Sequence, residues 1–145
     1  MNNTEYSLFT DGGSRGNPGN AAIGFVVYKN DKEIFTFKKF LGICTNNIAE
    51  YTALVYALTY LNKQGIKEVT CFLDSELVVK QLNGLYKVKD EKMKMYNERV
   101  QLLKKEFTNI TFNHVLREKN KLADKLVNEA LDEQENSKEQ IAVSN

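Results

Sequence analysis

The sequence predicts an α/β domain in which a mixed five-stranded sheet is flanked by helices. Apolar runs of strand length occur early in the chain, and segments with apolar residues at helical spacing follow them. The expected order is three strands, a helix, a strand, two helices, a strand and a last helix. Three consecutive strands favour an antiparallel meander, and a helical crossover then makes the fourth strand parallel to an earlier one.

The expected strands are rich in β-branched and aromatic residues and are bounded by turn formers. They cover Tyr6–Asp11, Ala21–Lys29, Glu33–Leu41, Glu68–Leu73 and Asn109–Leu116. The second and third are joined by Asn30-Asp31, a hairpin signal, and the third is strongly aromatic. We therefore expect the second and third strands to pair directly.

Four helices are expected between and after these strands. The first starts at a cap formed by Asn46-Asn47 and stops at Gly65. The others cover Ser75–Leu82, Lys89–Phe107 and Lys121–Asp132. Residues 1–132 would then form one domain, and the polar residues 133–145 a flexible tail.

Composition limits the class of protein. The 145 residues are 42% hydrophobic and 27% charged, which suits a single globular domain. No apolar run has membrane-spanning length and the start lacks a signal-peptide pattern, so we expect a cytoplasmic protein. Cys44 and Cys71 are too few for a disulfide framework or a structural zinc site. Net charge is +1, but residues 80–125 hold twelve Lys or Arg against six Asp or Glu, which suits either a phosphate-binding face or a solvated helix surface.

Four acidic residues are expected to meet at one edge of the sheet. Asp11 follows an apolar strand and precedes four of the eight glycines and the single proline, and Asp74 ends the fourth strand. Glu50 and Asp124 stand near helix starts, where the helix dipole favours a negative charge. Each acid alone has a structural explanation. Four converging carboxylates, however, repel one another unless cations neutralise them. Oxygen ligands suit Mg²⁺ or Mn²⁺, and the set suits a two-metal phosphodiester hydrolase.

On these residues the chain resembles ribonuclease H of type 1 over nearly its whole length, and the resemblance implies a ribonuclease H-like fold. Four segments carry the resemblance: Thr10-Asp11-Gly12-Gly13 with Gly16-Asn17-Pro18-Gly19, Thr45-Asn46-Asn47-Ile48-Ala49-Glu50, Leu73-Asp74-Ser75, and Asn120 with Ala123-Asp124. It implies endonucleolytic cleavage of the RNA strand of an RNA–DNA hybrid, leaving 3′-hydroxyl and 5′-phosphate ends. The four acids would bind two Mg²⁺ or Mn²⁺ ions and carry the catalysis.

The resemblance also implies substrate contacts. Asn17 and Thr45 match positions that hold a phosphate of the DNA strand, and Asn46 and Asn47 match positions that reach into the minor groove. Main-chain groups at Gly12 and Gly13 could test for 2′-hydroxyls, which only one strand of a hybrid displays. Asn120 matches a polar residue one turn before the last acid.

The sequence departs from the family pattern in three places. Only Gly84–Asp90 stands where many relatives insert a basic protrusion. We also expect no separate hybrid-binding domain, so affinity should rely on lysines such as Lys87 and Lys89. The loop before the last helix lacks the family's histidine, and Arg117 is nearest to that position. We expect Arg117 to assist product release or to position the cleaved phosphate. Glu76 replaces a glutamine that touches RNA in relatives, and its role and that of His114 stay open.

Two alternatives remain from the sequence. The protein could have broader specificity that includes double-stranded RNA, or it could be a non-catalytic nucleic-acid-binding domain of the same fold. Retention of all four acids favours the enzyme. We expect a monomer with no obligate protein partner and no membrane attachment.

Overall fold

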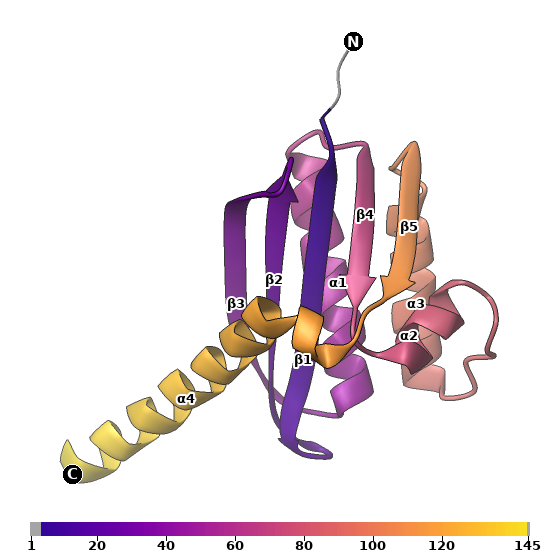
Figure 1. Ribbon diagram of the computed structural model, residues 1–145. Helices are drawn as coiled ribbons and strands as arrows, with labels where there is room; N and C mark the ends of the chain where they lie inside the picture. Colours follow the sequence, from indigo (N-terminus) through magenta and orange to yellow (C-terminus); the bar gives the residue numbers. More distant parts are fainter. Residues whose placement is uncertain (1–3, 145) are drawn as a thin grey trace.

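The computed structural model describes the backbone of residues 4–144 and the side chains of residues 4–137. Its five strands form one sheet in the order β3-β2-β1-β4-β5 (Figure 1). The strands are β1 (Tyr6–Gly16), β2 (Gly19–Lys29), β3 (Lys32–Cys44), β4 (Glu68–Leu73) and β5 (Asn109–His114). The first three are antiparallel, and β4 is parallel to both β1 and β5. The predicted mixed sheet is thereby confirmed.

Helices cover both faces of this sheet. Behind it in Figure 1 lie α1 (Asn46–Lys63) and α3 (Glu91–Lys104), with the short α2 (Glu76–Leu82) beside them. In front lies α4 (Lys121–Ser144), which crosses β2 and β3 after a 3-10 turn at Arg117–Lys119. The helix order follows the prediction. In the part of the chain that the structure describes, no helix is long and apolar enough to cross a membrane.

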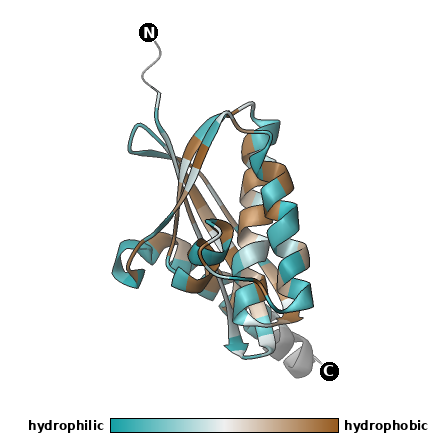
Figure 2. Cartoon of the chain, turned by 90° about the vertical axis from the view of Figure 1, so that its right-hand side faces the viewer, coloured by the Kyte–Doolittle hydropathy of each residue, from teal (hydrophilic) through white to brown (hydrophobic). Residues whose placement is uncertain are grey.

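The hydrophobic core is divided by the sheet. The larger part lies between the sheet and α1, where Leu8, Phe25 and Leu58 are almost completely buried. The smaller part lies under α4 and includes Ala22 and Val127. Figure 2 shows the apolar residues of the helices turned toward the strands. Helices therefore pack on both faces of the sheet, so side chains from either face can reach its edge.

The first strand is longer than predicted. It continues through the glycines to Gly16, and Gly12 and Gly13 pair with Ile23 and Ala22 of β2. The turn is confined to residues 16–19, because backbone pairing with β2 overrides the local turn preference of the glycines. Asp11 is consequently inside β1 rather than at its end.

Other boundaries also differ. The cap of α1 is Thr45, whose side chain accepts a hydrogen bond from the Ile48 N–H at 3.3 Å, instead of Asn46 and Asn47. The last helix does not stop at Asp132 but runs to Ser144. Arg15 of β1 contacts Asp132 and Glu135 at 2.7 and 2.8 Å and so supports the early part of this extension. Flexibility of residues 133–145 stays a prediction.

Candidate active site

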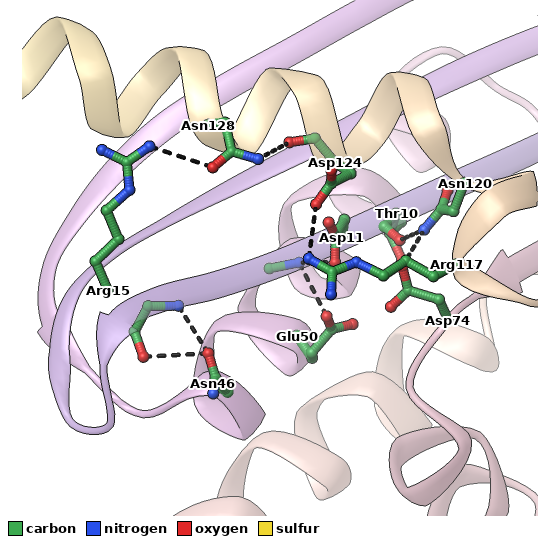
Figure 3. Close-up of polar contacts among 12 residues, drawn as sticks. Thr10, Asp11, Arg15, Asn46, Glu50, Asp74, Arg117, Asn120, Asp124 and Asn128 are labelled. Atoms are coloured by element: carbon green, nitrogen blue, oxygen red, sulfur yellow. Dashed lines mark hydrogen bonds and ion pairs between the residues drawn. The ribbon is translucent and has the colours of Figure 1, made fainter.

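Three buried or half-buried carboxylates form a cluster where β4 ends. One oxygen each from Asp11, Glu50 and Asp74 lies within 4.8 Å of the other two. The parallel register pairs Thr10 of β1 with Leu73 of β4, so the next residues of both strands, Asp11 and Asp74, come side by side. The expected neighbourhood of these two acids is confirmed, and Figure 3 shows them beside Glu50.

Gly12 is what allows Glu50 to reach this cluster. A Cβ atom on Gly12 would lie 2.3 Å from the carbonyl carbon and oxygen of Ala49, a contact that real structures do not tolerate. The missing side chain lets the first turn of α1 rest directly on β1. The Gly12 N–H then donates to Asp11 Oδ1 at 2.9 Å and to Glu50 Oε1 at 3.2 Å. This N–H is thus occupied by the two carboxylates.

Asp124 joins the site from the opposite face of the sheet. It lies in the first turn of α4, outside the group of three, and its negative charge acts on both Asp11 and Asp74. Arg117 Nη2 lies 3.6 Å from Asp124 Oδ1, although the Arg117 side chain is 81% exposed. The structure thus brings all four predicted acids to one region, with Asp124 on the rim.

Asn120, which directly precedes α4, holds part of the cluster in place. Its side-chain Nδ2 donates to the Thr10 carbonyl at 2.8 Å and to Asp74 Oδ2 at 3.2 Å, and the residue is 2% exposed. It therefore links the start of α4 to β1 and to the carboxylate after β4. Its position fits a residue that orients Asp74 rather than one that faces the solvent.

The carboxyl groups at the centre favour protonation when no cation is present. Burial raises the pKa of Asp11 from 3.8 to about 7, and the charges of Asp74 and Asp124 add to this. Burial and then the charge of Asp11 raise the pKa of Glu50 well above its usual value. Burial also raises the pKa of Asp74, against the opposing hydrogen bond from Asn120. A divalent cation bound to these carboxylates would favour their charged forms and so oppose these shifts.

The donor set suits such a cation. Among the described residues, Glu50 Oε2 is buried and has no hydrogen-bond partner, so one carboxylate oxygen at the centre is left for a ligand. All candidate ligands are oxygens, which Mg²⁺ and Mn²⁺ prefer. The cluster opens into a cleft of about 510 Å³, a volume larger than that of a phosphate group.

Most predicted substrate residues line this cleft. Besides the four acids, its walls include Gly12, Gly13, Asn46, Asn47 and Arg117. Asn17, Thr45 and Asn120 are not among its lining residues. Asn17 Oδ1 accepts a hydrogen bond from the Asn46 N–H at 3.1 Å, so it organises the start of α1. Direct contact of these residues with substrate stays a prediction.

The cleft also contains polar side chains that were not predicted from the sequence. Arg15 and Asn128 line the same cleft, and Arg15 Nη2 donates to Asn128 Oδ1 at 3.2 Å. Asn128 Nδ2 in turn donates to the Asp124 carbonyl at 3.1 Å (Figure 3). The spacing of four residues between Asp124 and Asn128 was the available signal, because such residues share a helix face.

His114 and Glu76, whose roles the sequence left open, do not line the cleft. His114 ends β5 opposite Leu73 and is exposed. Glu76 forms an ion pair with Lys80 at 2.7 Å, one turn along α2.

Comparison with known proteins gives consistent matches. A family model described as "Reverse transcriptase-like" matches residues 9–130. A bifunctional protein of Mycobacterium tuberculosis is 40% identical over 124 residues, which are 84% of this chain and 34% of that protein. The crystal structure of RNase H1 from Halobacterium salinarum has a TM-score of 0.86 and 38% identity, covering 89% of this chain and 98% of that one. LC11-RNase H1 in complex with an RNA/DNA hybrid has a TM-score of 0.85 and 42% identity, covering 90% and 99%.

The match to the mycobacterial protein is partial in length. This chain spans about one third of that relative, whereas it covers almost all of the two solved domains. The similarity therefore concerns the five-stranded domain and not the remaining two thirds of the mycobacterial protein.

Proposed function

Because this chain belongs to the ribonuclease H family of type 1, we propose that it hydrolyses the RNA strand of RNA–DNA hybrids. The observation that carries the proposal is the buried cluster of Asp11, Glu50 and Asp74 at the base of an open cleft, with Asp124 on its rim. The products would be 3′-hydroxyl and 5′-phosphate ends. Since a solved relative binds an RNA/DNA hybrid, we extend that substrate to this chain.

The four acids would hold two Mg²⁺ or Mn²⁺ ions. When bound, such ions supply an activated water and stabilise charge on the leaving oxygen. The free Oε2 of Glu50 and the carboxylates of Asp11 and Asp74 would hold the inner ion, and Asp124 would contribute on the rim. Preorganised ligands avoid the cost of rearranging carboxylates when the substrate arrives.

Other residues of the chain would orient these groups and the substrate. The Gly12 N–H fixes one oxygen each of Asp11 and Glu50, and Asn120 fixes Asp74. Arg117 has an exposed guanidinium at the cleft and suits contact with the cleaved phosphate.

Recognition of the hybrid would use the face around the start of α1. Asn46 and Asn47 line the cleft, and Asn46 Oδ1 accepts from the Ser14 N–H at 2.8 Å, which leaves its amide NH₂ for the minor groove. Lys87 and Lys89 are on the turn between α2 and α3 and would add contacts to phosphates. A monomeric, cytoplasmic enzyme without obligate protein partner remains our expectation.

The test is cleavage of strand-labelled substrates. The protein is incubated with RNA–DNA hybrid, duplex RNA, duplex DNA and single-stranded RNA in Mg²⁺, Mn²⁺ or chelator. We expect metal-dependent cuts in the RNA strand of the hybrid only. Cuts in duplex RNA would indicate the broader nuclease, and hybrid binding without any cut would indicate a non-catalytic domain. Asp11→Asn serves as the inactive control.

A further inference from the structure

The aromatic third strand has no part in the active site, but it forms a second groove. Phe35 and Phe37 of β3 face Tyr56 and Tyr60 of α1 across a groove of about 470 Å³, and Lys63 and Arg99 complete its edge. The buried ring of Phe25 forms its floor. The surface is thus apolar and aromatic, with two cationic side chains at its margin.

The rings of this groove are held in fixed orientations. Phe35 stacks on Tyr60 with centroids 4.0 Å apart and planes 9° apart. Phe37 lies against Tyr56 with centroids 5.9 Å apart and planes 20° apart, and Tyr56 is 39% exposed. Because these pairs bridge strand and helix, the flat ring surfaces are preformed and require little ordering on binding.

The charge of the groove is of one sign. Its lining contains Lys63 and Arg99 but no carboxylate. Within the described residues, neither cation forms an ion pair. The Arg99 guanidinium lies 5.8 Å from the Tyr96 ring centroid. Lys92, in the first turn of α3, is close enough to Cys44 for its charge to act on that thiol, so positive charge continues toward the start of α1.

The groove and the catalytic cleft lie along one helix. Asn46 at the start of α1 lines the cleft, and Tyr56 follows ten residues later, about 15 Å along the helix axis. Stacking surfaces bordered by cations are the usual means of binding single-stranded nucleic acid without sequence preference. A peptide partner would gain nothing from cations without carboxylate neighbours unless it were acidic. The groove therefore suits an extended polyanion with flat bases.

We infer that this groove binds single-stranded nucleic acid that continues from the hybrid seated in the cleft, an inference that rests on the proposed function for its biological context. Bases would lie against the Tyr56 and Phe37 rings, and phosphates would contact Lys63 and Arg99. The enzyme would then prefer hybrids that carry an unpaired extension over blunt-ended ones.

The test measures binding and cleavage separately. Fluorescence anisotropy with a labelled oligothymidylate in chelator needs neither metal nor hybrid cleavage. Tyr56→Ala should weaken this binding about 5- to 100-fold, as expected for loss of one stacking surface, and Lys63→Glu with Arg99→Glu should weaken it more steeply at low salt. Lys67→Glu, an exposed charge reversal outside the groove, is the matched control and should bind like the parent.

Cleavage distinguishes this inference from the proposed function. Groove variants should cut a blunt hybrid at the parental rate but lose the preference for an extended hybrid. The double charge reversal should keep the parental melting temperature, whereas Tyr56→Ala loses its ring contact with Phe37 and should melt slightly lower. If the parent protein does not bind oligothymidylate, or if all variants bind it equally, the inference that the groove binds single-stranded nucleic acid is wrong. The proposed nuclease activity would not be affected by that result. A concentration-dependent dimer abolished by Tyr56→Ala would likewise overturn the inference, since a second copy would be the occupant.

Discussion

Replacement of Asp11 by Asn should stabilise the metal-free protein at alkaline pH. Asp11 is 6% exposed, and burial raises its pKa from 3.8 to about 7. An acid with a raised pKa in the folded state holds a proton there that the unfolded chain has already released. Stability is therefore present at low pH and is lost as the pH rises from about 4 to about 7.

The magnitude follows from that interval. Each pH unit corresponds to about 1.4 kcal/mol, so the ionised Asp11 costs the folded state up to about 4 kcal/mol above pH 7. Asn keeps the acceptor oxygen for the Gly12 N–H but carries no charge. We expect a gain of about 2–4 kcal/mol, which corresponds to a melting temperature roughly 5–12 °C higher for a domain of this size.

The assay is thermal unfolding followed by circular dichroism in chelator at several pH values. The gap between Asp11→Asn and the parent should be absent below pH 4 and should widen to its full size above pH 7. Mg²⁺ should narrow the gap, because it binds and stabilises the parent. Glu76→Gln removes an exposed carboxylate paired with Lys80 and should not raise the melting temperature at any pH. An Asp11→Asn variant that melts at or below the parental temperature at pH 8.5 in chelator would refute the claim of crowded, buried charge.

Four further substitutions test other parts of the site and the supports of α4. Gly12→Ala forces a methyl group into the main chain of α1. It should lower the free energy of unfolding, measured by chemical denaturation, by about 1–3 kcal/mol and should remove most of the cleavage activity. Parental activity of this variant would contradict the packing role of Gly12. Arg15→Ala and Lys38→Ala each remove two ion pairs to α4, so their melting temperatures should fall slightly and alike, but only Arg15 lines the cleft and only its loss should slow hybrid cleavage. Arg117→Ala should lower turnover without a change in melting temperature, because its side chain is exposed; unchanged turnover would exclude a role in product release.

The sequence predicted the elements whose signals are local. The strand at Glu68–Leu73 was predicted at its observed bounds, because alternating apolar residues and the helix stop before it leave little choice. The predicted end of β1 at Asp11 was wrong, because pairing with β2 holds the following glycines in the sheet although glycines favour turns in isolation. The length of α4 was missed because part of its support comes from Arg15 and Lys38, more than ninety residues earlier in the chain. Such long-range ion pairs leave no periodic pattern in the sequence.

Two glycines explain why acids so far apart in the chain meet. Gly24 is the β2 partner of Asp11, and a Cβ atom there would lie 2.7 Å from Leu126 Cβ of α4. Gly12, the next residue after Asp11, makes the same allowance for α1 on the other face of the sheet. Both helices therefore approach the sheet at the strand position of Asp11. Glu50, the fifth residue of α1, and Asp124, in the first turn of α4, are thereby brought toward it. Sequence reasoning assigned Gly12 to the approach of the RNA, but the space of its missing side chain is already filled by α1. The geometry of the four carboxylates is thus set by helix packing before any ion or substrate binds, and a methyl group at Gly24 should displace Asp124 as one at Gly12 displaces Glu50.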